Sequence, residues 1–173
     1  MRMNTGWMLA LMLGASMAQA HVVLEQKSAV AGSYYKATFM VGHGCGGSPT
    51  TGIEIEMPEV MAVVKPMPKP GWTIVTQSAP APAGLSLHGR PVAEVLTRVS
   101  WQGGPLDDAR YDEFVLLLQL PKREGLLYFR VSQHCVHGRN DWVDVPVAGQ
   151  RGRLKMPAAV LELLPAAPAH HHH

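Results

Sequence analysis

The sequence has few charged or aromatic residues and little cysteine. Only 16% of its 173 residues are charged, 6% are aromatic, and two are cysteines. Its 15 Lys and Arg residues nearly balance 13 Asp and Glu residues. The chain therefore lacks the excess of basic residues with which proteins bind nucleic acid or an anionic membrane surface. This composition excludes nucleic acid as the main ligand.

Motifs of the common enzyme classes are also missing. There is no Ser-His-Asp order, glycine-rich phosphate loop or Cys-x-x-Cys pair. The acidic pairs Asp107-Asp108 and Asp112-Glu113 flank a turn and are predicted to form a solvated acidic face. We therefore expect a binding protein without turnover of its own.

Only one long apolar run occurs, and it lies at the N-terminus. Arg2 precedes an apolar stretch from Trp7 to Met17, which ends at the small-x-small pattern Ala18-Gln19-Ala20. These features are typical of a secretory signal over residues 1–20, and the run falls short of the roughly 20 residues that span a bilayer. We expect cleavage after Ala20 and, in a Gram-negative cell, a periplasmic protein without a membrane span. A retained N-terminal anchor is the alternative.

The remaining part of the chain has the length of one domain. Removing the signal leaves about 150 residues, enough for one hydrophobic core. We predict a domain over 21–150 and a C-terminal tail over 151–173, with a short helix at 157–164 and four histidines at its end. Those histidines are either a native metal-gathering tail or the remainder of an affinity tag, and no function is assigned to them.

The two cysteines, Cys45 and Cys135, both follow the signal. Exported compartments are oxidising, so a Cys45–Cys135 disulfide is the first interpretation. A metal site that uses one or both thiolates is the alternative.

Short strands separated by turn residues account for most of the domain. Residues 34–41, 50–57, 72–77, 92–101, 111–120, 126–132 and 141–147 are predicted strands, and four prolines between 58 and 71 confine any strand there to a sheet edge. This pattern predicts an all-β sandwich of Greek-key type, whose loops lie at its two ends. The loop around His43 and the turn around His134 and His137 would meet if the cysteines pair or share a metal.

His21 becomes the first residue if cleavage follows Ala20. Its free α-amine and ring Nδ1 can then bind one metal ion, and two nitrogen donors in one plane suit Cu(II). Of three methionines in this region, Met57 ends the second predicted strand, and Met61 and Met67 follow it. Their thioethers suit Cu(I), but they are more simply explained as fillers of irregular gaps in the core.

Several segments in order carry a family resemblance. They are His21-Val22-Val23-Leu24-Glu25-Gln26, Ala31-Gly32-Ser33-Tyr34-Tyr35-Lys36, Pro49-Thr50-Thr51, Lys69-Pro70-Gly71-Trp72, Tyr111-Asp112-Glu113-Phe114 and the late Trp142. With these segments the chain resembles the YcnI-like family of exported copper-binding proteins. The resemblance implies an immunoglobulin-like or cupredoxin-like sandwich and a Cu(II) site at the mature N-terminus.

In that family the first histidine forms a brace with its amine and ring, beside a carboxylate and a tryptophan. The brace falls on His21 and the tryptophan on Trp142, whereas the segment 42–47 has no carboxylate. Gly-His-Gly-Cys at 42–45 and Gln-x-Cys at 133–135 resemble a proteobacterial branch of the family. His43 and Glu25 are therefore further candidate ligands.

Cys45, Cys135 and His134 complete the set of candidate ligands. The expected function is binding of copper, as Cu(II) or also Cu(I), for delivery or homeostasis in the periplasm. Expected partners are periplasmic or inner-membrane copper-transport proteins. A copper-dependent oxidative enzyme with an N-terminal histidine and a metal-independent structural or adhesion sandwich are the two alternatives.

Overall fold

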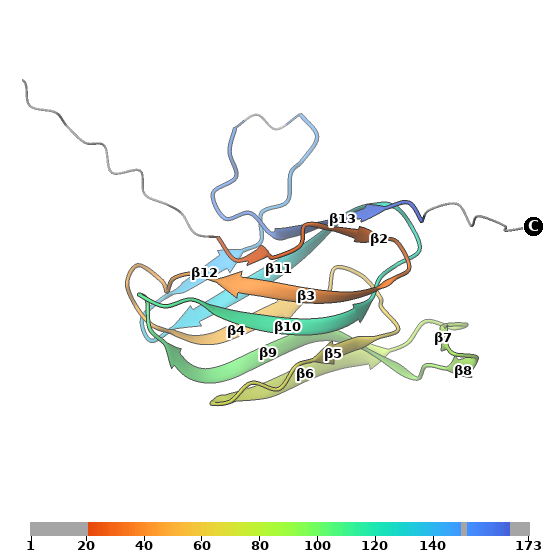
Figure 1. The fold of residues 1–173 in the computed structure, drawn as a ribbon, viewed down its shortest axis with the longest axis horizontal. Helices are drawn as coiled ribbons and strands as arrows, with labels where there is room; N and C mark the ends of the chain where they lie inside the picture. Colours follow the sequence, from red (N-terminus) through yellow and green to blue (C-terminus); the bar gives the residue numbers. More distant parts are fainter. Residues whose placement is uncertain (1–20, 150–151, 167–173) are drawn as a thin grey trace, which may run out of the picture.

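A computed structural model describes residues 21–149 and 152–166, which form a two-layer β-sandwich (Figure 1). The first sheet has the order β1-β3-β10-β5. Its strands are β1 (Val23–Leu24), β3 (Tyr34–Val41), β10 (Asp112–Gln119) and β5 (Val64–Pro66). The proline-containing β5 lies at a sheet edge, as the sequence predicts. The expected signal segment and the four C-terminal histidines lie outside the described residues.

The second sheet has the order β2-β13-β11-β4-β9-β6, and β12 pairs with β11 beside β13. Its strands are β2 (Ser28–Val30), β13 (Ala159–Leu164), β11 (Gly125–Cys135), β4 (Thr50–Glu56), β9 (Glu94–Leu106), β6 (Trp72–Pro80) and β12 (Arg139–Trp142). All pairs are antiparallel except β13 with β2. A small hairpin of β7 (Ser86–Leu87) and β8 (Arg90–Pro91) projects from one end (Figure 1).

The core lies between the two sheets. On β3, alternate residues from Tyr35 to Val41 are at most 4% exposed, and β11 contributes Leu127, Phe129 and Val131 in the same alternation. Phe39 and Phe129 meet edge to face across the layers at 5.4 Å. The predicted all-β sandwich is confirmed, because period-two burial follows from the pleat of each strand.

The short helix predicted at 157–164 is wrong. Residues 159–164 form β13, in which Ala159, Leu161 and Leu163 are buried against β11 and the intervening residues are exposed. The leucine-rich segment has good helix propensity, but its apolar residues repeat every second position, and tertiary packing decides in favour of a strand. The sandwich therefore extends into the segment predicted as a C-terminal tail.

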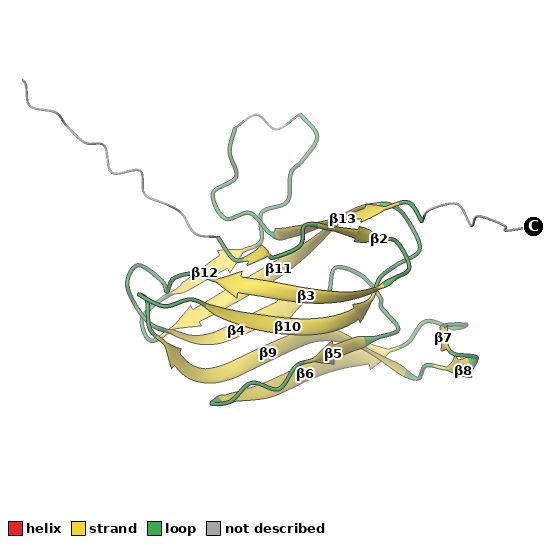
Figure 2. Cartoon of the chain, in the orientation of Figure 1, coloured by secondary structure: helices red, strands yellow, loops and turns green. Residues whose placement is uncertain are grey.

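Helices are absent from the described residues (Figure 2). Consequently no described segment is a helix that could cross a membrane.

Lys69 connects two of the motifs that carry the family resemblance. Its ammonium donates to the Asp112 carboxylate and to the carbonyl of Glu113, and it lies 5.1 Å from the ring centre of Phe114. Trp72 packs edge to face on the same Phe114 ring at 4.9 Å. Asp112 is thus an internal anchor for the connection before β6, which corrects its prediction as part of a solvated acidic face.

Replacing this ammonium should destabilise the fold. Lys69→Met keeps the apolar stem but leaves the Asp112 carboxylate, 34% exposed, without its cation, at an expected cost of about 2 kcal/mol in unfolding free energy. Urea denaturation measures the difference. Lys65→Met, on the exposed part of β5, is the control and should cost less than about 0.5 kcal/mol. Equal values for the two variants would contradict an anchoring role for Lys69.

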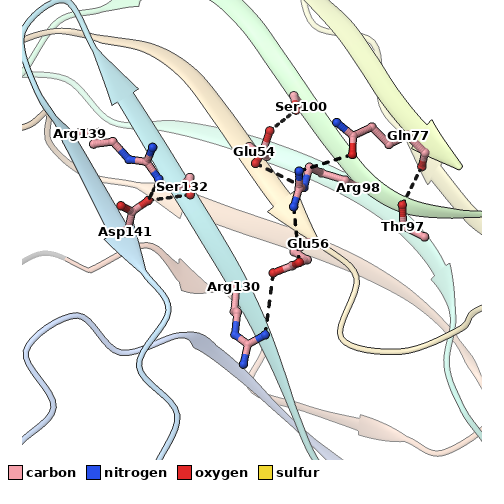
Figure 3. Close-up of polar contacts among 10 residues, drawn as sticks. All are labelled: Glu54, Glu56, Gln77, Thr97, Arg98, Ser100, Arg130, Ser132, Arg139 and Asp141. Atoms are coloured by element: carbon pink, nitrogen blue, oxygen red, sulfur yellow. Dashed lines mark hydrogen bonds and ion pairs between the residues drawn. The ribbon is translucent and has the colours of Figure 1, made fainter.

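Charged side chains cover the outer face of the larger sheet (Figure 3). Arg98 pairs with Glu54 and Glu56, and Glu56 also faces Arg130 at 4.0 Å. On β12 a hydrogen bond from Arg139 holds the pKa of Asp141 below its usual value. The charges named here thus have partners of opposite sign within the sheet, consistent with the predicted wet face of residues 50–57.

Candidate metal centre

Pairing with β3 places His21 beside the loop that contains His43. Val23 is opposite Met40 and Leu24 is opposite Phe39. Continuing this antiparallel register backwards by two residues puts His21 opposite Gly42, the residue before His43. The N-terminal end of the described chain and the β3–β4 loop therefore meet at one end of the sandwich.

Both histidine rings pack against Trp142. The ring centres of His21 and Trp142 are 5.3 Å apart, and those of His43 and Trp142 are 6.3 Å apart, with an interplanar angle of 73° in each pair. Trp142 is 4% exposed, and the two histidines are half-buried. The structure thus brings together three of the residues that the sequence nominates.

The loop around His43 has a fixed backbone. A side chain at Gly44 would place its Cβ 1.8 Å from the carbonyl oxygen of Ser48, so the loop can close only with glycine at this position. The Gly44 amide donates to Asp108 at 2.8 Å. Asp108 therefore anchors this loop, which corrects its predicted role in a solvated acidic face.

The tautomer of His43 follows from its neighbour. Its Nδ1 lies within hydrogen-bond distance of the Gly44 carbonyl oxygen, which can only accept, so Nδ1 carries the proton. In the neutral ring, Nε2 of His43 then keeps its lone pair. This arrangement is the usual one for a histidine that binds a metal through Nε2.

Gln133 joins the elements of this cluster from inside the sandwich. Its side-chain amide donates to the His43 carbonyl at 2.6 Å and to the Thr50 hydroxyl at 2.8 Å. Its carbonyl oxygen accepts from the Trp142 indole N–H at 3.2 Å and from Asn140 at 3.5 Å. All hydrogen-bonding positions of this residue, which is 1% exposed, are used.

Sequence reasoning did not identify Gln133 as a positioning residue. The available signal is that Gln133 follows Val131 on the inward-facing positions of an alternating strand, where a polar residue needs partners.

A disulfide joins Cys45 to Cys135, at a sequence separation of 90. The predicted disulfide is present, and the two cysteines are therefore not thiolate ligands in this state. Cys45 follows His43 by two positions, and Cys135 follows Gln133 by two positions. The covalent link thus holds the His43 loop against the strand that carries its main hydrogen-bond partner.

Two candidate ligands lie elsewhere. Glu25 is exposed beside Tyr35, whose pKa is raised to about 12 by burial and by this carboxylate. His134 follows the inward-facing Gln133, and successive residues of a strand point to opposite faces, so the side chain of His134 lies on the outer face of β11. There its Cβ packs over Gly52. Neither residue belongs to the cluster around Trp142.

The donors present fit a small nitrogen-rich metal site. Nε2 of His21 is buried without a hydrogen-bond partner, so the fold does not use this ring nitrogen as a structural donor or acceptor. Among residues 21–149 and 152–166, no three His, Cys, Asp or Glu side chains gather closely enough to hold a metal. Side chains therefore supply at most two donors of these types at any point, and a further donor has to come from the main chain.

The three methionines do not form a second site. Met57 and Met61 are 9% and 3% exposed within the hydrophobic core, whereas Met67 is 52% exposed. The first two therefore fill the core, as their simpler explanation predicts.

Removing the Gln133 amide should loosen this end of the sandwich. Gln133→Leu leaves the Trp142 N–H and the Thr50 hydroxyl without their buried partner, at an expected cost of about 3 kcal/mol in unfolding free energy. Ser132→Ala, one residue earlier on the outer face, is the control and should cost about 1 kcal/mol or less. If Gln133→Leu lost no more unfolding free energy than this control, the role of Gln133 in joining the elements of the cluster would be contradicted.

Comparisons with known proteins agree with this architecture. A solved structure described as an uncharacterized protein from Nocardia farcinica with an immunoglobulin-like fold matches with a TM-score of 0.65 and 23% identity, over 83% of this chain and 97% of that chain. No curated protein matches the sequence. Residues 21–163 match the family described as a domain of unknown function, DUF1775. The chain therefore belongs to the DUF1775 family, which includes the YcnI-like proteins.

Proposed function

We propose that the exported, cleaved protein binds Cu(II) at this end of the sandwich and serves copper delivery or homeostasis in the periplasm. The observation that carries the proposal is the convergence of His21 and His43 on one buried indole, Trp142. Segments far apart in the sequence bring both imidazoles to this indole.

The donor chemistry favours copper. Cleavage after Ala20 would free the α-amine of His21, which with Nδ1 of the same residue forms a chelate. Nε2 of His43 would add a third nitrogen. Amine and imidazole donors suit the tetragonal geometry of Cu(II), which also heads the affinity order of the divalent ions.

Trp142 and Gln133 would hold the site without binding the ion. The indole is a hydrogen-bond donor only, and its N–H is already bound to Gln133. Its ring covers one side of both imidazoles and excludes water there. The two histidines remain half-exposed at the end of the sandwich, where a partner protein can reach a bound ion.

A Cu(II) titration of the cleaved protein tests the proposal. His21→Ala should abolish specific binding, and His43→Ala should weaken it by about 100-fold, or about 2.7 kcal/mol. His88→Ala, in the β7–β8 turn, is the matched control and should bind like the parent. Unchanged affinity in His21→Ala would contradict this site, and absence of specific binding in the parent would favour the metal-independent sandwich.

A second experiment tests the alternative function as a copper-dependent oxidative enzyme. The copper-loaded protein is incubated with a reductant and peroxide, and oxidised products are measured. We expect no turnover above that of free copper, whereas sustained turnover that depends on His21 would assign an oxidative enzyme.

A further inference from the structure

Strand β6 is an unusual sheet edge. It spans Trp72–Pro80, nine residues, and in the described residues it pairs with β9 alone, at the lower border of the larger sheet in Figure 1. The other terminal strands of the two large sheets are much shorter: β1 has two residues, and β2 and β5 have three each. An edge of this length exposes a row of main-chain hydrogen-bonding groups.

Sequence features that normally protect an edge are missing from β6. Residues 72–79 contain no charged residue and no proline, and Pro80 stands at the very end. The irregularity in the β6–β9 pairing is on β9, where Thr97 is the extra residue, so β6 itself runs without a bulge. Native monomers usually blunt a long edge with lysine, proline or a bulge.

The pairing with β9 fixes which backbone groups point outward. The Gly104 amide donates to the Gly71 carbonyl, so this pair is of the hydrogen-bonded kind and every second residue of β6 after Gly71 faces β9. The alternation directs the N–H and C=O groups of Ile74, Thr76 and Ser78 away from β9. These residues offer donors and acceptors in equal number.

We infer that β6 pairs antiparallel with β6 of a second copy of this chain, with Thr76 opposite Thr76 of the partner. In this register Ile74 faces Ser78, and each pair exchanges both main-chain hydrogen bonds. The two large sheets then form one continuous sheet across a two-fold axis, as expected of an isologous contact.

Charge and side-chain pairing single out a second copy as the occupant. The opposed pairs are Thr76 with Thr76, Val75 with Gln77, and Ile74 with Ser78, so no like charges meet. Val75 is 42% exposed and would be covered by the partner strand. An acidic or basic strand would find no charge complement along β6.

This contact is separate from the copper proposal. In Figure 1, β6 and the β1–β12 end of the sandwich lie at opposite borders of the molecule, so dimerisation would leave His21 and His43 accessible. The experiment can therefore fail or succeed independently of copper binding.

Sedimentation equilibrium of the cleaved full chain, from micromolar to submillimolar concentration without copper, tests the inference. We expect the mass to rise towards twice that of the monomer. Thr76→Pro removes an outward N–H while leaving the β9 pairing intact, and should keep the protein monomeric. Val75→Lys should do the same by placing a charge on each copy, which gives a second variant if the proline impairs folding. Leu117→Lys, at 41% exposure in the middle of β10, is the matched control and should still dimerise.

Cross-linking tests the register. Thr76→Cys should form a disulfide-linked dimer on mild oxidation, because the two copies of this residue face each other. Thr73→Cys should not, since its copies lie roughly 20 Å apart in this register. A monomer at every concentration, a dimer that survives both edge variants, or cross-linking through Thr73 rather than Thr76 would each overturn the inference.

Discussion

Cleaved protein whose His21 α-amine carries an acetyl group is expected to lose specific Cu(II) binding while it keeps its fold. Acetylation converts the amine into an amide, which is uncharged and a poor metal donor. The His21 ring would remain beside Trp142, because that contact depends on packing and not on the amine. Only the chelate is removed, so the change isolates the main-chain donor from the imidazole.

The acetylated protein, made by ligation, is compared with unmodified protein made by the same route. Copper affinity is measured by competition with a chelator of known affinity, and thermal unfolding reports the fold. We expect loss of tight binding with an unchanged melting temperature. Equal copper affinity of the two proteins would contradict participation of the amine.

This prediction also concerns the timing of metal loading. In the uncleaved chain the His21 nitrogen is a peptide amide, equivalent to the acetylated form. Copper binding at this site would therefore begin only after the proposed export and cleavage. Such an order would prevent the precursor from withdrawing copper inside the cell.

Loss of the Cys45–Cys135 disulfide should have the largest effect on stability. The disulfide links residues at a sequence separation of 90 and so restricts the unfolded chain. Replacing both cysteines by serine removes this restriction and is expected to cost about 4–5 kcal/mol in unfolding free energy. The same change releases the loop of His43 from the strand of Gln133. Copper affinity should therefore fall together with stability.

Urea denaturation of the double variant measures the loss of unfolding free energy. A copper titration at low temperature, where the variant is still folded, measures the loss of copper affinity. Parent protein whose disulfide has been reduced should show the same loss of unfolding free energy. A stability loss below about 1 kcal/mol, or full copper affinity in the folded variant, would contradict the role given to the disulfide.

Strand positions were accessible from the sequence because they depend on local alternation. The predicted strand at 34–41 is β3 in full, and 111–120 contains β10. The helix predicted at 157–164 was wrong because leucine and alanine favour helices, whereas the conformation of this segment is decided by its packing against β11. The predicted strand at 141–147 ends at Trp142, where pairing with β11 stops.

The candidate site was only partly accessible. His21 was nominated from the predicted cleavage site, whereas Trp142 came from the family resemblance, because no local pattern links residues so far apart in the chain. His43 was nominated as a possible donor, and its contact with Trp142 depends on the disulfide and the Gln133 hydrogen bond that join its loop to β11. The roles of Gln133 and Asp108 depend on hydrogen bonds between distant segments, which residue spacing does not encode.

Electron paramagnetic resonance of the cleaved protein with one equivalent of Cu(II) tests the central claim most directly. The account predicts a tetragonal spectrum with nitrogen couplings from the amine and ring of His21 and the ring of His43. His43→Ala should remove the coupling of one imidazole, and His21→Ala should leave only the spectrum of weakly bound copper. A parent spectrum that persists unchanged in His21→Ala would contradict the account.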